Sequence, residues 1–439
     1  MAMKKSSIWN SIADNTKYSV SISSISGVSY ICNNGKRSLI ERIFWIGMVI
    51  CMIILAAWQG LSVYTHYKER PVIVTVDNAY FEWKFEFPTA TICSVDLKPD
   101  SQLRTIIEKL NLKLNISRQL LGSEYADFIN YLQDLAFKNY MSYHEYKEYS
   151  ARIKREFLHP DQYMEVLDEV TLNIAETTGK PAINFPMKQV RPVLRVFTEW
   201  GPCMVANPNV SIYFTPKYFN SSNLYADYQP IVFTVNDLTS FLFQKPNSTK
   251  GVSHIYFHAP NEVMEIMDRK DTLPHQRFLT SKYEADVVQT SQNVLPLTVE
   301  QKNCRLPLDY GEEPLLHSPV YSYNLCKFEC RIKIALKYCN CTPYYYRRLA
   351  HEPICNLSGL YCLSKYKTQL IYARDSSIEC PNCLQNCDVY VFRGYETALP
   401  YTFLQTTLDT GIIFPNIVYI RNLVYSKIDL TGDLIFYKL

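Results

Sequence analysis

The sequence lacks the short motifs that mark the common enzyme classes. It contains no G-x-S-x-G, H-E-x-x-H, P-loop or dinucleotide-binding pattern, and such patterns supply the nucleophiles, metal ligands and phosphate-binding backbone of those enzymes. Its eight histidines are not grouped at metal-ligand spacing. The net charge is only +3 and there is no long basic run, which argues against nucleic acid as a partner. These absences predict a protein that is not an enzyme, uses no cofactor or metal and binds no nucleic acid.

Charged side chains are also missing from residues 43–63, which read IFWIGMVICMIILAAWQGLSV. As a helix this run would be about 31 Å long at ~1.5 Å per residue, enough to cross a bilayer. A buried core helix is one alternative, but a helix this apolar on every face is uncommon in a soluble domain. A cleaved signal peptide is another, but its apolar core would be shorter and closer to the first residue. The run therefore predicts a transmembrane helix over residues 43–64.

The residues on either side of this span differ in charge and in glycosylation motifs. Before it, basic residues outnumber the acidic Asp14 and Glu41: Lys4, Lys5, Lys17, Lys36, Arg37 and Arg42. This bias predicts a cytosolic segment 1–42 and an extracellular domain 65–439. N-x-[ST] glycosylation motifs occur only after the span, which agrees with this orientation. The candidate acceptors are Asn115, Asn209, Asn220, Asn247, Asn340 and Asn356.

The cysteines follow the same division. Of the 14 cysteines, Cys32 and Cys51 precede residue 65 and the other twelve follow it, an even number on the side where disulfides form. The stretch CPNC (380–383) also permits half of a zinc site or a redox motif. A second half with matching spacing and a thioredoxin-like βαβ context are both missing. The twelve cysteines are therefore predicted to form disulfides.

Spacing narrows the disulfide pairing. Cys326 and Cys330 are four residues apart and share a helix face, while Cys380, Cys383 and Cys387 are spaced to share the face of a second helix. Two antiparallel helices would bring these rows together in nested order. The predicted pairs are Cys326–Cys383, Cys330–Cys380, Cys304–Cys387, Cys339–Cys362, Cys341–Cys355 and, as the remaining two, Cys93–Cys203.

The exported part alternates between strand and helix patterns. Residues 71–76, 87–93, 231–235 and 252–257 are rich in β-branched residues and bounded by turn residues, which predicts strands. Between 101 and 175 the apolar residues recur at helical spacing instead, as in Leu103, Ile106, Ile107 and Leu110 and in Tyr125, Phe128, Ile129 and Leu132. These patterns predict an α+β membrane protein with one N-terminal transmembrane helix, a β-sheet core and a helical insertion at about 96–180.

Several motifs together resemble one family. They are SSISGVSYI (23–31), ERIFW (41–45), FPTATIC (87–93), GPCMVANPN (201–209), HAPNE (258–262) and the cysteine-rich stretch from YSYNLCKFEC to CPNCLQNCDVYVF. With them, residues 23–430 resemble the degenerin and epithelial sodium channel family and are similar to the insect pickpocket channels within it. The resemblance implies a homo- or hetero-trimeric, sodium-selective, amiloride-sensitive gated cation channel of the plasma membrane. It also implies a hand-like ectodomain, with the finger at about 96–180, the thumb at about 300–390 and palm and β-ball strands elsewhere.

The sequence departs from the family pattern at two places. Ser26 stands where the cytosolic His-Gly gating motif has its histidine, which leaves only Gly27. After Ala398 no charge-free stretch reaches the length of a bilayer, so the chain is expected to lack the second pore helix and its G-x-S selectivity filter. The alternative function is a non-conducting, membrane-anchored accessory or ligand-binding ectodomain that assembles with full-length subunits. His258 is interpreted as a strand-end residue and not as a proton sensor.

Overall fold

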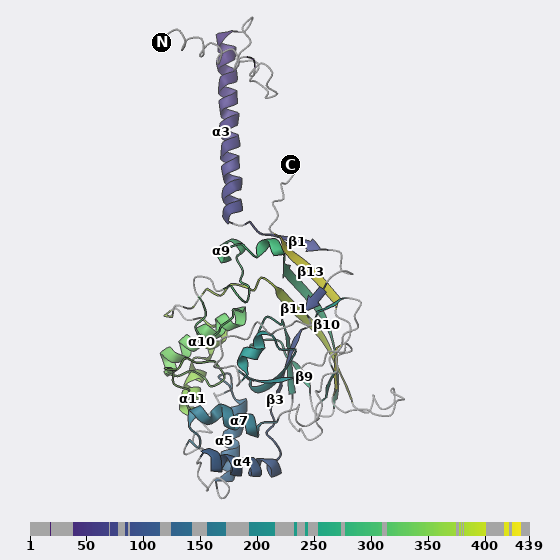
Figure 1. Cartoon of the computed structure of the whole chain (residues 1–439), viewed down its shortest axis with the longest axis vertical. Helices are drawn as coiled ribbons and strands as arrows, with labels where there is room; N and C mark the ends of the chain where they lie inside the picture. Colours follow the sequence, from purple (N-terminus) through teal and green to yellow (C-terminus); the bar gives the residue numbers. More distant parts are fainter. Residues whose placement is uncertain are drawn as a thin grey trace, which may run out of the picture. The chain divides into compact units, whose positions relative to one another are not determined.

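The chain forms two compact units, which lie within Met1–Pro71 and Val72–Asp433. Among the residues that the structure describes, the first contains one long helix and the second contains three β-sheets with helices packed beside them (Figure 1). Apart from Tyr18, the computed structural model describes residues 38–69, 71–77, 84–86, 88–114, 124–142, 156–172, 193–215, 232–234, 242–244, 253–273, 277–309, 314–374, 377–378, 380, 382–400, 417–420 and 424–431.

A five-stranded antiparallel sheet forms the centre of the second unit. Its strands run in the order β4-β5-β3-β8-β9. Every position of β3 and β5 is buried, as expected of central strands rich in β-branched and small residues. The bounds are β3 Thr89–Ser94, β4 Leu194–Thr198, β5 Gly201–Ala206, β8 Ser253–His258 and β9 Asp271–Leu273. The strands predicted at 87–93 and 252–257 are therefore confirmed.

A six-stranded mixed sheet is built around the long strand β10. This strand pairs in parallel with β12 and β13 and antiparallel with β11, while β1 and β7 complete the two ends through antiparallel pairs with β13 and β12. A separate small sheet contains only β2 and β6. The bounds are β1 Ile73–Asp77, β2 Lys84–Glu86, β6 Val232–Thr234, β7 Leu242–Gln244, β10 Arg277–Thr290, β11 Val389–Pro400, β12 Ile417–Ile420 and β13 Val424–Thr431.

A group of helices follows β3 in the sequence. It contains α4 Asp100–Leu114, α5 Tyr125–Phe137, the 3-10 turn η4 Pro160–Gln162 and α7 Tyr163–Val170. The two ends of the group meet in an isolated β-bridge between Leu97 and Thr171. Leu103, Ile107 and Leu110 of the predicted apolar stripe are buried on α4, because residues three and four apart share one helix face. The stripe therefore packs this helix against the core.

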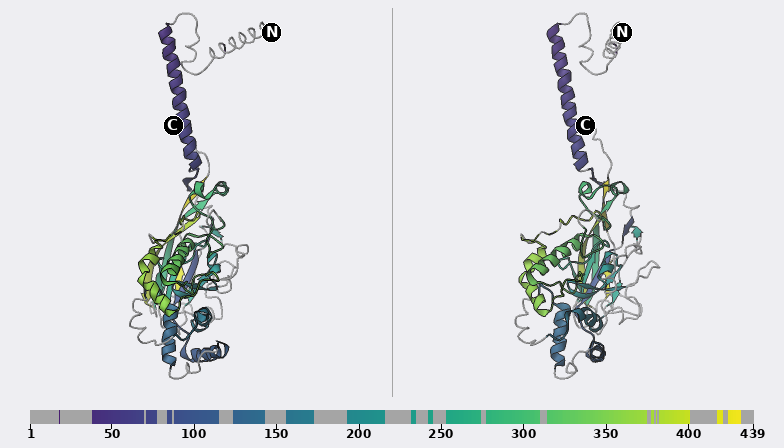
Figure 2. Two further views of the ribbon diagram at one scale, coloured as in Figure 1. Left: turned by 90° about the vertical axis from the view of Figure 1, so that its left-hand side faces the viewer. Right: turned by 60° about the vertical axis from the view of Figure 1, so that its left-hand side comes forward.

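A second group of helices lies beside the five-stranded sheet, as the views in Figures 1 and 2 show. It contains α10 Tyr323–Cys339, α11 Leu357–Lys365 and α12 Lys367–Tyr372. Ser322 caps α10 by accepting a hydrogen bond from Leu325 N at 3.2 Å. One cluster of buried side chains joins this group to α4, α5 and α7. The remaining short elements are α9 Val299–Lys302, η5 Val210–Phe214 and η8 Gln292–Val294.

The prediction of a second cysteine-bearing helix over Cys380–Cys387 is wrong. The described residues of this segment form no helix; Arg305 N donates to Gln385 O at 3.0 Å and Cys387 N donates to Arg305 O at 3.0 Å. These bonds are those of extended chains that lie side by side. The i, i+3, i+7 spacing therefore predicted correctly that these cysteines lie beside α10, but the helix assumed for them does not form.

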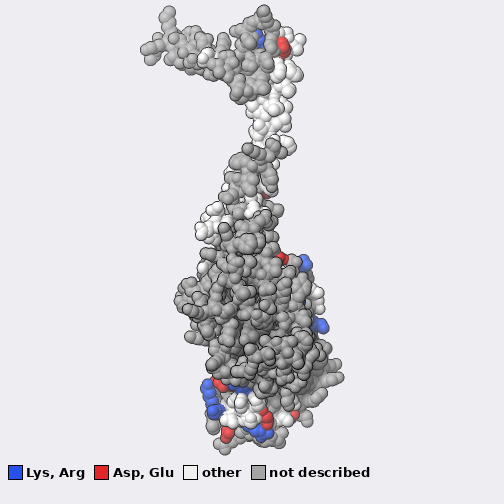
Figure 3. Space-filling view, turned by 90° about the vertical axis from the view of Figure 1, so that its right-hand side faces the viewer, with Lys and Arg blue, Asp and Glu red and all other residues white. Residues whose placement is uncertain are grey.

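The first unit contains α3, Leu39–Glu69, which has 31 residues. Among the described residues it is the one helix long and apolar enough to cross a membrane, and none of its side chains is buried within the protein. Figure 3 shows its middle as an uncharged white surface. At ~1.5 Å per residue the helix is about 46 Å long, more than the ~30 Å hydrocarbon core. The predicted span at 43–64 therefore lies inside a longer helix.

Candidate functional site

Six disulfides connect the elements of the second unit. They are the six predicted pairs: Cys93–Cys203, Cys304–Cys387, Cys326–Cys383, Cys330–Cys380, Cys339–Cys362 and Cys341–Cys355. Their Cα–Cα distances run from 4.4 to 5.7 Å, within the range that disulfide geometry allows. Among the described residues, Cys51 in α3 is a free cysteine.

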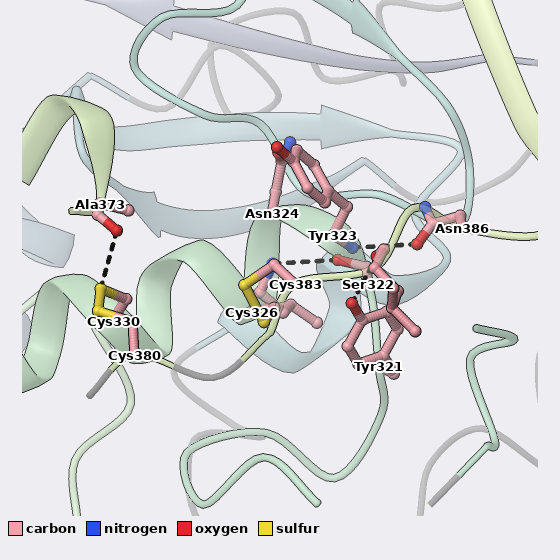
Figure 4. Close-up of a disulfide and its surroundings, with 12 residues drawn as sticks. Tyr321, Ser322, Tyr323, Asn324, Cys326, Cys330, Ala373, Cys380, Cys383 and Asn386 are labelled. Carbon is pink, nitrogen blue, oxygen red and sulfur yellow. Dashed lines mark hydrogen bonds between the residues drawn. A yellow bond between two sulfur atoms is a disulfide. The ribbon is translucent and has the colours of Figure 1, made fainter. Parts of the chain in front are cut away.

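Helix α10 is the element that these bonds brace most strongly. Cys326 and Cys330 attach its N-terminal half to the extended segment that carries Cys383 and Cys380, as Figure 4 shows. Cys339 attaches its C-terminal end to α11. Each disulfide restricts the unfolded chain and contributes about 2–4 kcal/mol. The helix is therefore fixed along its length.

A half-buried carboxylate, that of Glu262, holds the N-terminus of α10. Glu262 accepts hydrogen bonds from Tyr323 N at 3.0 Å and Asn324 N at 3.2 Å, two of the N–H groups that a helix start leaves without an intrahelical partner. It also accepts hydrogen bonds from Asn386 Nδ2 and from the Ser322 hydroxyl. Burial raises the pKa of Glu262 to about 7 in spite of these bonds. The segment 259–268 is thereby tied to both α10 and the chain beside Cys387.

Arg331 lies at the centre of the first of two buried charge clusters on α10. Its side chain is fully buried, and Nη1 donates to Glu199 Oε1 at 2.7 Å while Nη2 contacts Glu265 Oε1. Nε also donates to Leu370 O at 2.7 Å. Burial alone would lower the pKa of Arg331, but the charges of Glu199 and Glu265 outweigh it and hold that pKa above its ordinary value. The guanidinium therefore stays charged and joins α10, α12 and two loops.

Glu199 sits in the turn between β4 and β5, and a close approach of backbones positions it. Gly201, with φ of 93°, ends this turn, and a Cβ there would meet Ala136 O at 1.8 Å, so only glycine fits. The Glu199 carboxylate also accepts hydrogen bonds from Ile266 N at 2.8 Å, Tyr140 Oη at 3.3 Å and Tyr346 Oη. Its negative charge is thus fully hydrogen-bonded, as a buried carboxylate requires.

Glu265 completes the charge balance of this cluster. Lys327 Nζ lies 2.9 Å from Glu265 Oε2, one helical turn before Arg331. The two cations, Lys327 and Arg331, therefore face two carboxylates. A buried network that is charge-balanced and hydrogen-bonded fixes relative positions more than it adds stability, because desolvation offsets much of the attraction. The Arg331 cluster, defined as Arg331, Lys327, Glu199, Glu265 and Tyr140 with Tyr346, is a rigid junction.

His317 is the centre of the second charge cluster. Its Nδ1 lies 2.9 Å from Glu329 Oε2 on α10, and its Nε2 lies 2.9 Å from Glu352 Oε1. A carboxylate accepts hydrogen bonds, so both ring nitrogens must donate, which only the imidazolium form can do. Burial alone would lower the pKa of His317, but the bonds and charges of Glu329 and Glu352 outweigh it and raise that pKa. The His317 cluster is thus a cation held between two carboxylates.

Glu352 extends the His317 cluster to the loop after α10. Its Oε2 accepts hydrogen bonds from Leu349 N at 3.1 Å and Thr342 Oγ1 at 3.2 Å. The Cys341–Cys355 disulfide closes this same loop. Arg347 lines the space beside His317 and Glu329, and Arg348 Nη1 donates to Glu352 O at 3.0 Å. The His317 cluster therefore joins α10 to the residues that precede it and to the loop that follows it in the sequence.

Several residues singled out in the sequence have defined places. His258 is the last residue of β8, with Nε2 2.8 Å from Thr91 Oγ1 and Nδ1 3.0 Å from Ala259 O. Burial lowers the pKa of His258 to about 4, so it is neutral at neutral pH, as a strand-end residue. Asn209 is buried, while Asn340 and Asn356 are exposed. Outside the described residues lie Ser26, Gly27, Asn115, Asn220 and Asn247.

Sequence reasoning missed the two charge clusters. Arg331 and Glu199 are 132 residues apart in the sequence, and nothing in one sequence connects them. One local signal was available, because Arg331 and Glu329 lie among the buried residues Phe328, Cys330 and Ile332 of a single helix. Charged side chains inside an apolar stretch are rarely buried unless they are paired. Within the described part of the chain, no group of His, Cys, Asp and Glu side chains is arranged to hold a metal ion.

A helix of membrane-spanning length followed by a disulfide-rich α+β domain defines a class of membrane-anchored ectodomain proteins. The sequence model of one family, described as ASC, amiloride-sensitive sodium channel, matches residues 20–428. The chain therefore belongs to the amiloride-sensitive sodium channel family, whose members are ion channels.

Two curated proteins of Drosophila melanogaster are similar to the chain over most of its length. Sodium channel protein Nach is 21% identical over 400 residues, which cover 83% of this chain and 70% of that protein. Pickpocket protein 28 is 21% identical over 407 residues, which cover 86% of this chain and 63% of that protein. The chain thus spans somewhat less than two thirds of the length of the second relative. The family resemblance found from the motifs is confirmed.

Proposed function

We propose that the protein is a subunit of a trimeric, sodium-selective, amiloride-sensitive gated cation channel of the plasma membrane. The observation that carries this proposal is the family match over residues 20–428. Helix α3 and the six disulfides support it, because they fit a membrane anchor and an exported domain. In this proposal residues 1–42 are cytosolic, residues 65–439 are extracellular, and the trimer contains copies of this chain or related subunits. Sodium is the transported ion, and no cofactor is involved.

We assign the regions of the ectodomain by their secondary structure. The helices α4, α5 and α7 correspond to the finger, and α10, α11 and α12 with their disulfides correspond to the thumb. The strands around β10 and the five-stranded sheet correspond to the palm and β-ball. The Arg331 cluster then lies where thumb, finger and central sheet meet, since it joins α10 to the β4–β5 turn and to Tyr140 after α5.

A path of contacts leads from α10 to β1, the strand that follows α3 in the sequence. Beyond Cys383 the chain reaches Asp388, whose Oδ1 accepts from Thr290 N at 2.7 Å at the end of β10. Strand β10 pairs with β13, and β13 pairs with β1, which follows α3 in the sequence after a short connection. A rigid α10 would transmit a displacement of the helical side of the ectodomain along this path. In the proposal this is how an extracellular stimulus gates the channel.

The test is a voltage-clamp recording from cells that express the protein from its complete transcript. The proposal predicts an inward current that amiloride blocks and that disappears when external sodium is replaced by N-methyl-D-glucamine. Biotinylation of surface protein is the control for delivery to the membrane. Surface protein without any such current, either alone or together with a related subunit, would contradict the proposal. Altered current of a co-expressed relative without current from this protein alone would favour the accessory function.

A further inference from the structure

The three described glycosylation motifs differ sharply in what the fold leaves accessible. They begin at Asn209, Asn340 and Asn356. N-linked glycosylation needs the asparagine side chain and the hydroxyl two residues later in the active site of the transferase. There, Nδ2 attacks C1 of a lipid-pyrophosphate-linked oligosaccharide, loses a proton and displaces the lipid pyrophosphate. Both side chains must therefore be accessible at the time of transfer.

The motif at Asn209 is inside the protein. Asn209, Val210 and Ser211 are 4%, 0% and 3% exposed. Val210 N donates to Pro260 O at 3.3 Å and Ser211 Oγ donates to Glu262 O at 3.5 Å. A sugar on Asn209 would have to displace the segment that holds the N-terminus of α10. A correctly folded chain therefore leaves Asn209 unmodified.

The motif at Asn356 is open in the folded protein. Asn356 and Ser358 are both exposed at the start of α11. Asn356 caps this helix through its oxygen, because Oδ1 accepts from Gly359 N at 2.8 Å. The cap does not use Nδ2, which is the atom that bonds to a glycan. A glycan at this position is therefore compatible with the helix start that the structure shows.

In the motif at Asn340 the asparagine is accessible, but the threonine is not. Asn340 is exposed at the end of α10, with φ of 52°. Thr342, however, is 0% exposed; its hydroxyl donates to the buried Glu352 and its N–H donates to Pro353 O at 2.8 Å. Cys341, between them, is bonded to Cys355. Once this disulfide has closed, the transferase cannot reach the threonine hydroxyl.

We infer that Asn356 carries an N-linked glycan, that Asn209 carries none, and that Asn340 is modified only in chains that reach the transferase before the Cys341–Cys355 disulfide closes. Glycosylation and disulfide closure then compete at Asn340. In the closure, two thiols lose two protons and two electrons to a disulfide-bearing oxidoreductase of the secretory pathway. The inference rests on the proposed function, because it requires residues 65–439 to be exported.

The structure places the two exposed acceptors together. Asn340 and Asn356 each adjoin one cysteine of the Cys341–Cys355 pair, whose Cα atoms are 4.8 Å apart. Glycans on both would cover one corner of the molecule at the C-terminal end of α10. A subunit or ligand that contacts α10 would therefore have to bind away from this corner.

The experiment measures glycan occupancy at each asparagine by mass spectrometry of the full chain expressed in insect cells. Peptides are deglycosylated enzymatically in ¹⁸O water, which marks each formerly modified asparagine. For the wild type we expect high occupancy at Asn356, partial occupancy at Asn340 and none at Asn209. In the Cys341→Ser/Cys355→Ser variant the occupancy of Asn340 should rise to that of Asn356. The control variant Cys304→Ser/Cys387→Ser removes a distant disulfide and should leave Asn340 unchanged.

The outcomes separate this inference from the proposed function. A glycan on Asn209, or equal occupancy of Asn340 in the wild type and in Cys341→Ser/Cys355→Ser, would overturn the inference while leaving the exported placement intact. A rise at Asn340 in both double variants would overturn it too, because general misfolding would then explain the change. No glycan at any of the three sites, with the ectodomain also protected from external protease, would overturn the proposed orientation itself.

Discussion

The two charge clusters of α10 use the same arrangement with different cations. In one, Arg331 lies between Glu199 and Glu265; in the other, His317 lies between Glu329 and Glu352. All six side chains are buried or nearly so. An arginine keeps its charge at every pH that a folded protein survives, whereas a histidine titrates close to neutrality. The ion pairs of the Arg331 cluster therefore persist at all these pH values, whereas those of the His317 cluster exist only while the imidazole is protonated.

The difference also concerns what each cluster holds. Arg331 connects elements far apart in the sequence: α10, the β4–β5 turn, the segment around Glu265 and the backbone of α12. His317 connects only α10 with the residues just before it and with the loop that follows it. Loss of the Arg331 cluster would therefore weaken the packing between distant elements. Loss of the His317 cluster would weaken only the contacts at the two ends of α10. The comparison predicts unequal effects when each cluster is broken.

The largest effect is expected for Arg331→Met. It leaves the carboxylates of Glu199 and Glu265 buried with one partner fewer, and breaking a buried ion pair in this way costs about 3–5 kcal/mol. Urea unfolding of the detergent-solubilised protein, followed by tryptophan fluorescence, measures the loss. The matched control is Arg104→Met, whose pair with Asp100 at 3.3 Å is exposed and is worth about 0–1 kcal/mol. Equal stability of the two variants would show that the Arg331 cluster is not a brace.

The next effect is expected for the double variant Cys341→Ser/Cys355→Ser. Opening this loop should cost about 3 kcal/mol by loop entropy and should also release Glu352 from His317. The variant should therefore lose both stability and the pH dependence that His317 supplies. Cys304→Ser/Cys387→Ser, which opens a longer loop with a separation of 83 residues, should lose stability but keep that pH dependence. If the Cys341→Ser/Cys355→Ser variant kept the pH dependence, the contact between Glu352 and His317 would not depend on this disulfide.

A smaller loss is expected for His317→Gln at pH 6. Glutamine keeps some hydrogen bonding but removes the positive charge between two carboxylates, and hydrogen bonds to charged groups are worth about 1.5–3 kcal/mol each. Partial replacement of the bonds predicts a loss of about 2 kcal/mol in the same urea assay. His351→Gln, an exposed histidine in the neighbouring loop, is the control and should unfold like the wild type. A stable His317→Gln protein would contradict the imidazolium assignment.

The smallest effect is expected for Tyr140→Phe. It removes one of the four protein groups that donate hydrogen bonds to Glu199 and leaves the Arg331 ion pair in place. Because this bond is long at 3.3 Å, the loss should be near 1.5 kcal/mol, the lower end for a charged acceptor. Tyr372→Phe, on an exposed tyrosine, should change nothing in the same assay. A loss as large as that of Arg331→Met would show that Tyr140 has a further role.

The sequence predicted the parts of the fold that depend on local pattern. The apolar run gave α3, β-branched runs gave β3 and β8, and helical spacing gave α4 and α5. All six predicted disulfide pairs form, five from the nested order of the cysteines and Cys93–Cys203 as the remaining two, although residues 382–387 form no helix. Proximity alone determines which sulfurs can pair, so the pairing survived an error in secondary structure.

The charge clusters could not be predicted in the same way. Glu199, Glu265 and Arg331 come from different elements, and their meeting depends on the packing of α10 against the five-stranded sheet. His317 precedes α10 in a segment without regular structure, where periodicity gives no information. The exposed Asn340 and Asn356 and the buried Asn209 also look alike in sequence, because the motif does not encode burial.

The difference between the Arg331 cluster and the His317 cluster is tested most directly by the free energy of unfolding of wild type, His317→Gln and Arg331→Met, measured between pH 5 and 9. The pKa of His317 is raised above its unfolded value of about 6.5. The contribution of His317 to the free energy of unfolding is therefore fully present below that pH. It is lost as the pH rises through the pKa of His317 in the folded protein. His258, whose pKa is lowered to about 4, acts oppositely and loses stability as the pH falls below 6.5; all three proteins share this change.

The account predicts that the gap between wild type and His317→Gln is widest near pH 6 and narrows steadily above about 6.5. It predicts that the gap between wild type and Arg331→Met does not narrow above about pH 6.5, because arginine keeps its charge there. A constant gap for His317→Gln would contradict the account, since His317 would then be a neutral residue and α10 would have no proton-dependent brace.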